Sequence, residues 1–308
     1  MIVLVNPHAG SDKARARWDA LEPHFRRTFG DVPVVYTTGS EDIQQAVRAA
    51  ARSEDPRIVV AGGDGTANEV VNALMHLKPA LRDRCTLGAI GLGSSNDFHK
   101  PFKSAETLDG VPTRLAFQTA EPCDVGLVRY SSDTTVSRRF FFLNASAGIT
   151  AEGNARFNSP GPLLKILKRT HVPLAILYAA FTSLFTYKDI PVRLNVAGAG
   201  SLFTSMTNLG ILKSPYFSGD LRYDASRNYS NGRFVVVACS GMDIRHRLSL
   251  FRALKNGSLS GLQMVRSWST PAVEIESPAS FLLEMDGETV QAHWARFTVV
   301  PRILKVCP

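Results

Sequence analysis

The sequence predicts an N-terminal α/β domain followed by a C-terminal antiparallel β-sandwich. Over residues 1–122, short apolar runs alternate with helical stretches, which is typical of a layered α/β sheet. From Cys123 on, β-type alternation dominates, and Gly, Pro, Ser and Asn turns separate the strands, as in a sandwich. With 308 residues, 44% of them hydrophobic, the chain can divide its core between two domains.

The first β-α step joins an apolar strand at residues 2–5 to a helix over residues 14–29. Between them lie Asn6-Pro7 and Gly10, at the carboxyl end of the strand, where open α/β sheets bind ligands. An Asn-Pro pair followed by a glycine is also an ordinary loop. Residues 6–10 are therefore either part of a ligand site or a plain turn.

The most informative stretch is residues 58–70, Ile-Val-Val-Ala-Gly-Gly-Asp-Gly-Thr-Ala-Asn-Glu-Val. A buried strand leads into a glycine-rich turn, and we expect a helix from Thr66. Glycine N–H groups and the positive end of a helix dipole together form a cradle for phosphate. Asp64 within this turn fits a carboxylate that holds Mg²⁺ or accepts a proton. Glu69 is expected in the first turn of the helix, where a carboxylate complements the dipole.

A second loop of the same kind follows the fourth strand, at residues 86–90. It reads Gly-Leu-Gly-Ser-Ser-Asn-Asp-Phe over residues 91–98. Serine hydroxyls and backbone N–H groups bind phosphate, and Asp97 adds a second carboxylate. Two glycine-rich polar loops thus follow consecutive strands.

Together, the motif at residues 62–70 and the loop at residues 91–98 resemble the central motifs of the diacylglycerol kinase catalytic family, which includes sphingosine kinase-like lipid kinases. NAD kinases and phosphofructokinases share the first motif, whereas the second is specific. The chain departs from the family with Ser94, where Thr is usual, and with His99-Lys100-Pro101, where Ala-Arg often follows. Serine keeps the hydroxyl, and the altered flank leaves the orientation of the substrate open.

The resemblance implies a Rossmann-like, three-layer α/β domain of the NAD kinase and diacylglycerol kinase type over residues 1–122, to which a tail at about residues 296–308 returns. It implies a β-sandwich lipid-substrate domain over residues 123–295, with the site in the crevice between the domains. The implied activity is ATP- and Mg²⁺-dependent transfer of the γ-phosphoryl group to a lipid hydroxyl, of the diacylglycerol or sphingoid-base type. Which lipid is the acceptor stays open.

The resemblance also implies roles for single residues. The phosphates would be held by Gly62, Gly63, Gly65, Thr66, Ser94, Ser95 and Asn96, with Glu69 nearby. The nucleoside would be lined by Asn6, Gly10 and Thr37, which follows a strand at residues 32–36. The candidates for binding Mg²⁺ are Asp64, Asp97 and Asp124, and an ordinary turn residue is an equal alternative for Asp124.

The general base implied by the resemblance is Asp286, with Asp64 second, and Glu288 would orient Asp286 or contact the nucleotide. Taken alone, an Asp286-Gly287 turn after a strand is ordinary hairpin chemistry. If these roles are right, Asp64→Asn and Asp286→Asn each abolish turnover while thermal stability stays nearly intact. Which carboxylate holds Mg²⁺ and which takes the proton stays open.

Three stretches of the second half also matter. Residues 140–148 predict one strand, and residues 160–187 predict one long helical stretch with basic side chains at its edge. That stretch either lies on an anionic membrane surface or packs on a sheet. The nearest match to the family's metal-binding Asp-Gly turn is Asn231-Gly232, so a structural metal there stays open.

The net charge of the chain indicates which classes of binding partner it favours. The formal net charge of +8 and the pI of about 9.5 favour anionic partners such as nucleotide phosphates or acidic lipid headgroups. Nucleic acid ranks last, because the chain has no zinc-finger spacing and no aromatic-basic RNA motif.

The cysteine positions and the length of the uncharged runs indicate the cellular location of the protein. The cysteines are scattered, as in a reduced cytosolic protein: Cys85, Cys123, Cys239 and Cys307. No signal peptide is visible, and the longest uncharged run, residues 172–187, is shorter than the ~20 apolar residues of a membrane span. We expect a cytoplasmic protein that associates peripherally with membranes and has no transmembrane segment. Its oligomeric state, a homodimer included, stays open.

Three rival functions remain, of which the last, a purely membrane-adhering structural protein, would not need four aspartates at the ends of loops. A soluble-substrate kinase of the NAD kinase type shares the first loop, although the Asn-Asp-Phe motif and the apolar second half argue against it. A non-catalytic nucleotide- or lipid-binding homologue would keep the fold, although the retained Asp64, Asp97 and Asp286 argue against it.

Overall fold

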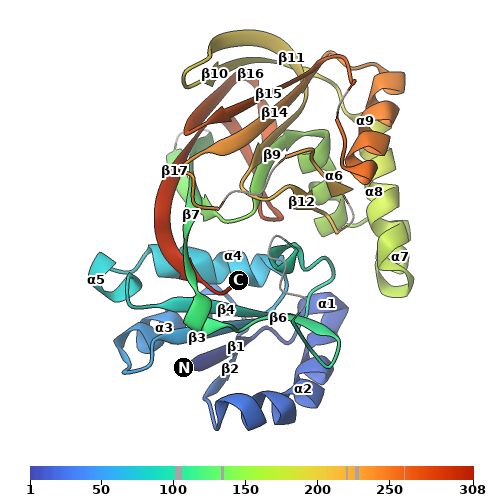
Figure 1. Cartoon of the computed structure of the whole chain (residues 1–308). Helices are drawn as coiled ribbons and strands as arrows, with labels where there is room; N and C mark the ends of the chain where they lie inside the picture. Colours follow the sequence, from blue (N-terminus) through green and yellow to red (C-terminus); the bar gives the residue numbers. More distant parts are fainter. Residues whose placement is uncertain (101–105, 133–134, 220, 226–228, 260) are drawn as a thin grey trace. The chain divides into compact units, whose positions relative to one another are not determined.

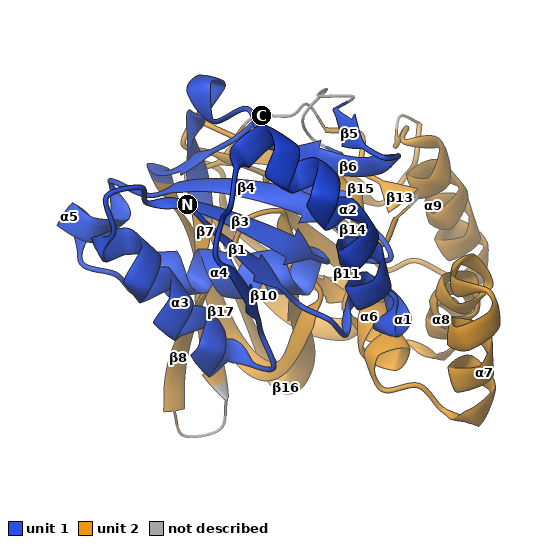
Figure 2. Cartoon of the chain, turned by 90° about the horizontal axis from the view of Figure 1, so that it is seen from below, with its two compact units in different colours: residues 1–125, 301–308 blue, residues 126–300 orange. Residues whose placement is uncertain are grey.

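The computed structural model describes residues 1–100, 106–132, 135–219, 221–225, 229–259 and 261–308, so Pro101 of the altered flank lies outside the described residues. The chain folds into two units, one of residues 1–125 and 301–308 and one of residues 126–300 (Figure 2). The sequence places the corresponding boundaries at residues 122/123 and 295/296. The chain passes from one unit to the other within two strands, β7 (Glu121–Ser132) and β17 (Glu288–Val306).

Unit 1, residues 1–125 and 301–308, is built on a parallel sheet. β1 pairs with both β2 and β3, and β3 pairs with β4, all in parallel. The end of β17 also pairs with β4 in parallel, and β6 pairs with β4 in the antiparallel direction. The strands are β1 (Ile2–Val5), β2 (Val34–Tyr36), β3 (Arg57–Gly62), β4 (Thr86–Gly91), β5 (Thr107–Leu108) and β6 (Val111–Arg114). The helices are α1 (Ala9–Asp12), α2 (Ala14–Phe29), α3 (Ser40–Arg52), α4 (Asp64–Met75) and α5 (Pro79–Arg82), with short 3-10 helices at Asp97–His99 and Phe117–Thr119.

Helices cover both faces of this sheet. Successive side chains of a strand point to opposite faces, so a strand buried on two sides reads as a continuous apolar run. Val3, Val5 and Val59 pack with Trp18 and Phe25 of α2 in one cluster. Helix α4 lies on the other side of the sheet (Figure 1). The α/β fold class predicted for the first half is confirmed.

The strands of unit 2, residues 126–300, pair antiparallel. Their order is β15-β14-β11-β10-β16-β17, and β9 pairs with β11 and β16. Bulges between Met206 and Asn208 in β11 and between Glu276 and Phe281 in β16 bend these long strands. The remaining bounds are β8 (Thr135–Phe141), β9 (Asn144–Gly148), β10 (Ile190–Val196), β11 (Gly200–Leu212), β12 (Tyr216–Phe217), β13 (Leu221–Arg222), β14 (Phe234–Ser240), β15 (Val265–Thr270) and β16 (Ala272–Met285).

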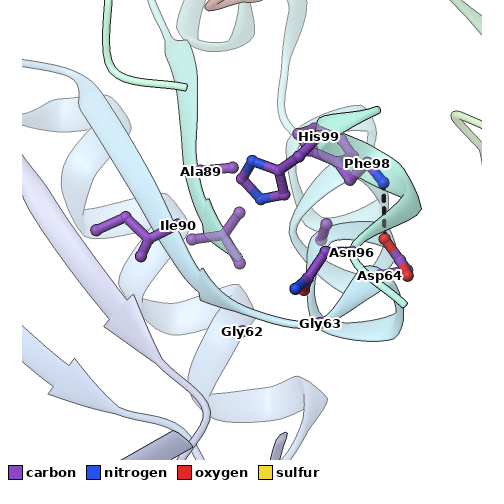
Figure 3. A pocket seen from close by; sticks show the side chains of 10 residues that line it. Gly62, Gly63, Asp64, Ala89, Ile90, Asn96, Phe98 and His99 are labelled. Carbon is purple, nitrogen blue, oxygen red and sulfur yellow. Dashed lines mark hydrogen bonds between the residues drawn. The ribbon is translucent and has the colours of Figure 1, made fainter. Parts of the chain in front are cut away.

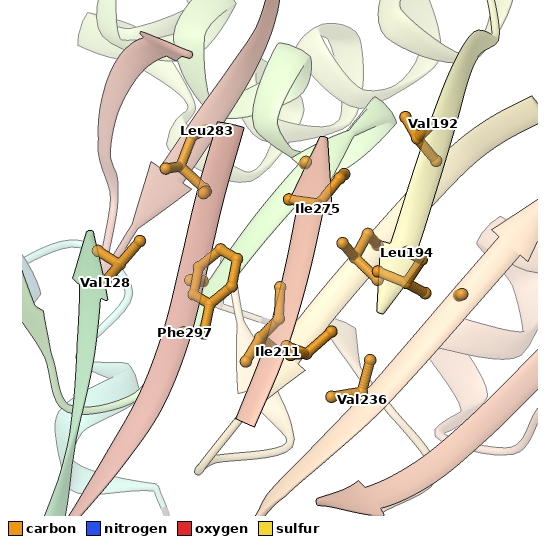
Figure 4. Close-up of a cluster of buried hydrophobic side chains, with 14 of the residues drawn as sticks. Val128, Val192, Leu194, Ile211, Val236, Ile275, Leu283 and Phe297 are labelled. Carbon is orange, nitrogen blue, oxygen red and sulfur yellow. The ribbon is translucent and has the colours of Figure 1, made fainter. Parts of the chain in front are cut away.

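The core of unit 2 is made by side chains that the strands turn inward. Ile211, Ile275 and Phe297 are fully buried there and lie close together (Figure 4). Around Ile275 and Phe297 buried positions alternate with outward ones, whereas β11 is buried on both faces around Ile211. The predicted antiparallel β-sandwich is confirmed.

The helical stretch predicted over residues 160–187 is two helices, so the prediction of one long helix is wrong. Helix α7 (Pro162–Thr170) ends before His171, whose φ of −151° is extended, and α8 (Val172–Thr186) begins after it. Pro173 lacks an N–H group and fits only the first turn of a helix, which explains the new start. Unit 2 also contains α6 (Ile149–Asn158) and α9 (Ile244–Asn256). Among the described residues, none of the helices has both the length and the apolar content needed to span a membrane.

The single strand predicted over residues 140–148 is also wrong, because β8 ends at Phe141 and β9 begins at Asn144. At this break the N–H groups of Phe142, Leu143 and Asn144 donate to the carboxylate of Asp286. The ladder is interrupted because a distant side chain supplies the acceptors.

Candidate active site

The two glycine-rich loops meet at the carboxyl ends of β3 and β4. A Cβ atom on Gly93 would lie 2.4 Å from Cα of Gly63, and a Cβ atom on Gly63 would lie 3.2 Å from Cα of Gly93. At Gly62, a Cβ atom would lie 2.8 Å from the side chain of Thr66. The backbones approach this closely only because no side chain stands between them.

Helix α4 begins at Asp64, two residues earlier than the predicted start at Thr66, which is therefore wrong. Gly63 is its N-cap, and Asp64 and Gly65 belong to the first turn. The dipole of the helix favours a carboxylate at this position. The first N–H groups of a helix have no acceptor within the helix, so this end of α4 is suited to bind an anion. Glu69 lies in the second turn, so its predicted place in the first turn is wrong too.

Asp64 connects the two loops. Its Oδ1 accepts a hydrogen bond of 2.8 Å from the backbone N–H of Phe98 (Figure 3). Asp64, Asn96 and His99 line one small pocket between β3, β4 and α4. Burial, with the nearby Arg114 guanidinium, lowers the pKa of His99 to about 3, so this imidazole is neutral at pH 7.

The side chain of Asn96 holds the shape of its own loop. Asn96 has a φ of 51°, and its Oδ1 accepts from the N–H of Gly93 at 2.9 Å. Its Nδ2 donates to the carbonyl oxygens of Gly91 and Gly93 at 3.1 and 3.2 Å. By contrast, the hydroxyl groups of Ser94 and Ser95 make no hydrogen bond within the described part of the chain. The assignment of Ser94 and Ser95 to the phosphates stays a prediction.

The end of β1 reaches the same place. Nδ2 of Asn6 donates to Oγ1 of Thr66 at 2.9 Å. Gly10 has a φ of +60°, and a Cβ atom there would lie 2.6 Å from the carbonyl oxygen of Leu92. Hence the loops after β1, β3 and β4 come together in unit 1, at the edge of the sheet where the sequence predicts a ligand.

Thr37, expected to line the nucleoside, is buried against β1. Its N–H and its Oγ1 both donate to the carbonyl oxygen of Val5, at 2.9 and 3.4 Å. Its assignment to the nucleoside stays a prediction.

The three aspartates expected to bind Mg²⁺ have different surroundings. Asp97 is buried and forms an ion pair of 2.8 Å with Lys100. Asp124 is fully buried, and its Oδ1 accepts from the N–H of Arg302 at 2.9 Å, where the backbone of Arg302 has a φ of 49°. Among the residues that the structure describes, no three His, Cys, Asp or Glu side chains form a metal-binding group. Mg²⁺ bound with a nucleotide commonly uses one or two carboxylates, so these assignments stay predictions.

In unit 2, Asp286 forms the predicted hairpin turn between β16 and β17, which is confirmed. Asp286 and Gly287 have φ values of 47° and 96°, as a two-residue turn of type I′ requires. The buried carboxylate of Asp286 accepts three backbone N–H groups, from Phe142 at 2.6 Å, Leu143 at 2.9 Å and Asn144 at 3.0 Å. These bonds fix the carboxylate in one orientation.

Glu284, which the sequence reasoning missed, supports this turn. Its Oε1 accepts from the N–H of Gly287 and its Oε2 from the hydroxyl of Ser146, both at 2.6 Å. A signal existed, because Glu284 stands in the otherwise apolar run Phe281–Met285 at the end of β16. Glu288 is exposed.

Arg114 is a second residue that the sequence reasoning missed. Its guanidinium is fully buried, where Nε donates to the carbonyl oxygen of Cys307 and Nη1 to that of Phe98, both at 2.8 Å. It also lies 4.5 Å from the ring centroid of Phe98. No local pattern marks it, because the two acceptors come from segments far from it in the sequence.

Two family models together match nearly all of the chain. The diacylglycerol kinase catalytic domain matches residues 1–128, and the YegS C-terminal NAD kinase β-sandwich-like domain matches residues 145–308. The chain belongs to the diacylglycerol kinase catalytic-domain family.

Individual relatives agree with this. A probable lipid kinase YegS-like of Stenotrophomonas maltophilia is 26% identical over 97% of this chain and 93% of its own. The diacylglycerol kinase of Bacillus subtilis is 29% identical over 49% of this chain and 46% of its own. The crystal structure of a diacylglycerol kinase from Bacillus anthracis superposes with a TM-score of 0.69 and 17% identity, covering 99% of this chain and 95% of that one, which shows a common fold.

The Asn231-Gly232 turn, which is the nearest match to the family's metal-binding Asp-Gly turn, lies beside the side chain of Lys213. Oδ1 of Asn231 accepts from the N–H of Arg233 at 3.0 Å. The buried Lys213 places its Nζ 2.9 Å from the carbonyl oxygen of Arg233 and 3.5 Å from Oδ1 of Asn231. A positive charge beside this turn opposes the binding of a divalent cation.

Proposed function

We propose that the chain is an ATP- and Mg²⁺-dependent lipid kinase, which transfers the γ-phosphoryl group of ATP to a lipid hydroxyl. The observation that carries the proposal is the close approach of Gly63 and Gly93 beside the start of α4, where no side chain separates the two loops and the end of the helix favours an anion. The names of the relatives, lipid kinase and diacylglycerol kinase, support a lipid as acceptor.

The phosphates of ATP would bind at the first turn of α4. Gly62, Gly63, Gly65 and Thr66 supply backbone groups there, and a Cβ atom at Gly63 or Gly93 would close the space. The hydroxyl groups of Ser94 and Ser95 would add donors from the second loop. Asn6 orients the hydroxyl of Thr66 through the bond between them.

Asp64 is the first candidate for the ion, because a carboxylate oxygen is the kind of ligand that Mg²⁺ prefers. Asp97 and Asp124 would act with it. When bound, Mg²⁺ would neutralise the negative charge of the phosphates. Transfer of a phosphoryl group otherwise needs little from the protein beyond position and charge.

We propose Asp286 as the base that takes the proton of the lipid hydroxyl, with Asp64 as the second candidate. A carboxylate offers about four lone-pair positions. Three N–H groups use three of those positions on Asp286 and hold it in place. A carboxylate oxygen of Asp286 would take the proton, and Glu288 would contact the nucleotide or orient Asp286.

The test is phosphate transfer from labelled ATP to a panel of lipids in mixed micelles. The panel contains a diacylglycerol, a sphingoid base, a ceramide, a phosphatidylglycerol and a polyprenol. Asp64→Asn keeps the acceptor oxygen for the N–H of Phe98, so it should stay folded and lose turnover. The exposed Asp83→Asn in the same unit is the matched control and should keep turnover.

Two results would contradict the proposal. Binding of ATP-Mg²⁺ without transfer to any lipid would favour the non-catalytic homologue. Transfer to NAD with none to lipids would favour a kinase with a soluble substrate.

A further inference from the structure

Helix α8 exposes its large apolar side chains. Leu174 is 48% exposed and Phe185 is 60% exposed. The exposed set lies at positions i, i+3, i+4, i+7 and i+11, which follow one face of a helix: Leu174, Leu177, Tyr178, Phe181 and Phe185.

The buried side chains of α8 are small, apart from Leu184. Ala175 is 0% exposed and Ala179 is 2% exposed, and Ser183 on the same face is also buried. Ala175 and Ala179 cluster with the buried Leu164 of α7. A helix on a protein in water normally buries its large apolar face and exposes the other. In α8 most of the large apolar side chains are instead exposed, and Leu184 is the large one that is buried.

Helix α7 extends the exposed apolar surface with Leu163 and Ile166. We call these two and the five exposed residues of α8 the α7–α8 surface. Of the eleven large apolar side chains exposed in the described part of the chain, seven belong to it. They are therefore gathered in one place, which marks a surface for interaction.

The charged side chains within helices α7, α8 and α9 all have one sign, whereas the acidic Asp189 and Asp243 lie just outside the helices. Helices α7, α8 and α9 contain no Asp or Glu, whereas α7 carries Lys165, Lys168 and Arg169 and α9 carries Arg245, Arg247, Arg252 and Lys255. Phe251 of α9 contacts Phe181 of α8, with 5.3 Å between ring centroids. Helix α9 lies beside α8 in unit 2 (Figure 1).

Two of the cations serve the fold. Arg247 pairs with Asp189 at 2.6 Å, and Lys168 donates to the carbonyl oxygen of Phe157 at 2.9 Å. The others are exposed, namely Lys165, Arg169, Arg245, Arg252 and Lys255.

We propose that the α7–α8 surface docks the chain on an anionic phospholipid bilayer. The exposed apolar face would enter the boundary between headgroups and acyl chains, and the cations would contact acidic headgroups. A second copy of the chain is a poor occupant, because pairing this surface with itself would bring two sets of cations together. The inference goes beyond the proposed function, because docking needs no turnover.

The test is flotation of the full chain with vesicles of phosphatidylcholine, with and without phosphatidylglycerol. The wild type should float with the anionic vesicles and less with neutral ones. Phe185→Glu puts a charge on the apolar face and should weaken binding at least about tenfold. Phe203→Glu is the matched control, because Phe203 is exposed too but lies on β11, and it should bind like the wild type.

A second pair of variants tests the charges. Lys165→Gln with Arg169→Gln should weaken binding to anionic vesicles about tenfold and leave binding to neutral ones unchanged. Arg52→Gln with Lys78→Gln removes the same charge from exposed positions in unit 1 and should have no effect.

Three results would overturn the proposal. One is a wild type that floats with neither kind of vesicle. The second is a Phe185→Glu variant that floats as well as the wild type. The third is a wild-type dimer in sedimentation that Phe185→Glu separates while vesicle binding stays, which would assign the surface to a second copy. Turnover in detergent micelles is measured in parallel, so that failure of the kinase and failure of docking are read separately.

Discussion

At the scale of single residues, the closest backbone contact of the candidate site rests on Gly93. We predict that Gly93→Ala destabilises the protein by about 1–3 kcal/mol, because the new Cβ atom would lie 2.4 Å from Cα of Gly63 and backbone must shift. Transfer of phosphate should fall by about 100-fold, since the loops would no longer fit the phosphates. Unfolding in urea and the transfer assay measure the two effects.

The control is Gly161→Ala. Gly161 has a φ of −65°, and nothing lies within 4 Å of a Cβ atom placed on it. It should keep transfer and lose no more than about 1 kcal/mol of stability, because Gly161 is the N-cap of α7. If Gly93→Ala behaves in the same way, the two loops do not depend on their close approach.

The sequence predicts that Asp286→Asn leaves thermal stability nearly intact, whereas the three N–H groups bound to the carboxylate predict a loss of stability. In Asp286→Asn an NH₂ group replaces one acceptor and faces a backbone N–H group. We predict a loss of about 1–3 kcal/mol in the free energy of unfolding, together with lost turnover. The exposed Glu288→Gln should change stability by less than about 0.5 kcal/mol. Unchanged stability in Asp286→Asn would mean that the N–H groups are not important for folding.

At the scale of secondary-structure elements, sequence patterns predicted most helices and turns whose structure depends on residues close in the sequence. The helix over residues 14–29 and the Asp286-Gly287 hairpin depend on local periodicity and turn chemistry, and both are confirmed. Patterns failed where a distant group decides the local structure. The break between β8 and β9 is set by a carboxylate more than 140 residues away in the sequence. The burial of Arg114 likewise depends on the carbonyl oxygens of Phe98 and Cys307, which lie far from it in the sequence.

The turn at Asn231 gives a prediction about metal. Because the ammonium of Lys213 lies beside this turn, we expect a chelator to leave the thermal unfolding of the nucleotide-free protein unchanged. Differential scanning calorimetry with and without the chelator measures this. A lower melting temperature in the chelator, restored by a divalent cation, would show that a structural metal is bound despite the missing carboxylate.

At the scale of the whole molecule, the units are connected by continuous strands. β17 pairs with β16 in unit 2 and with β4 in unit 1. If the sheet of one unit unfolds, the sheet of the other unit therefore loses the order of a strand that it shares. We therefore expect the two units to unfold together. The cysteines offer a probe of each unit, since Cys85 and Cys307 belong to unit 1 and Cys239 to unit 2.

All the cysteines are buried, and burial raises the pKa of Cys85 to about 11 and those of Cys239 and Cys307 to about 12. Only the thiolate reacts quickly with a disulfide reagent. We predict that the native protein reacts slowly and that Cys239 and Cys85 become reactive at the same concentration of urea. The variants Cys239→Ala and Cys85→Ala identify which thiol reacts. Reaction of Cys239 at a lower concentration than Cys85 would mean that unit 2 unfolds first, and that a shared strand is not enough to make the two units unfold as one.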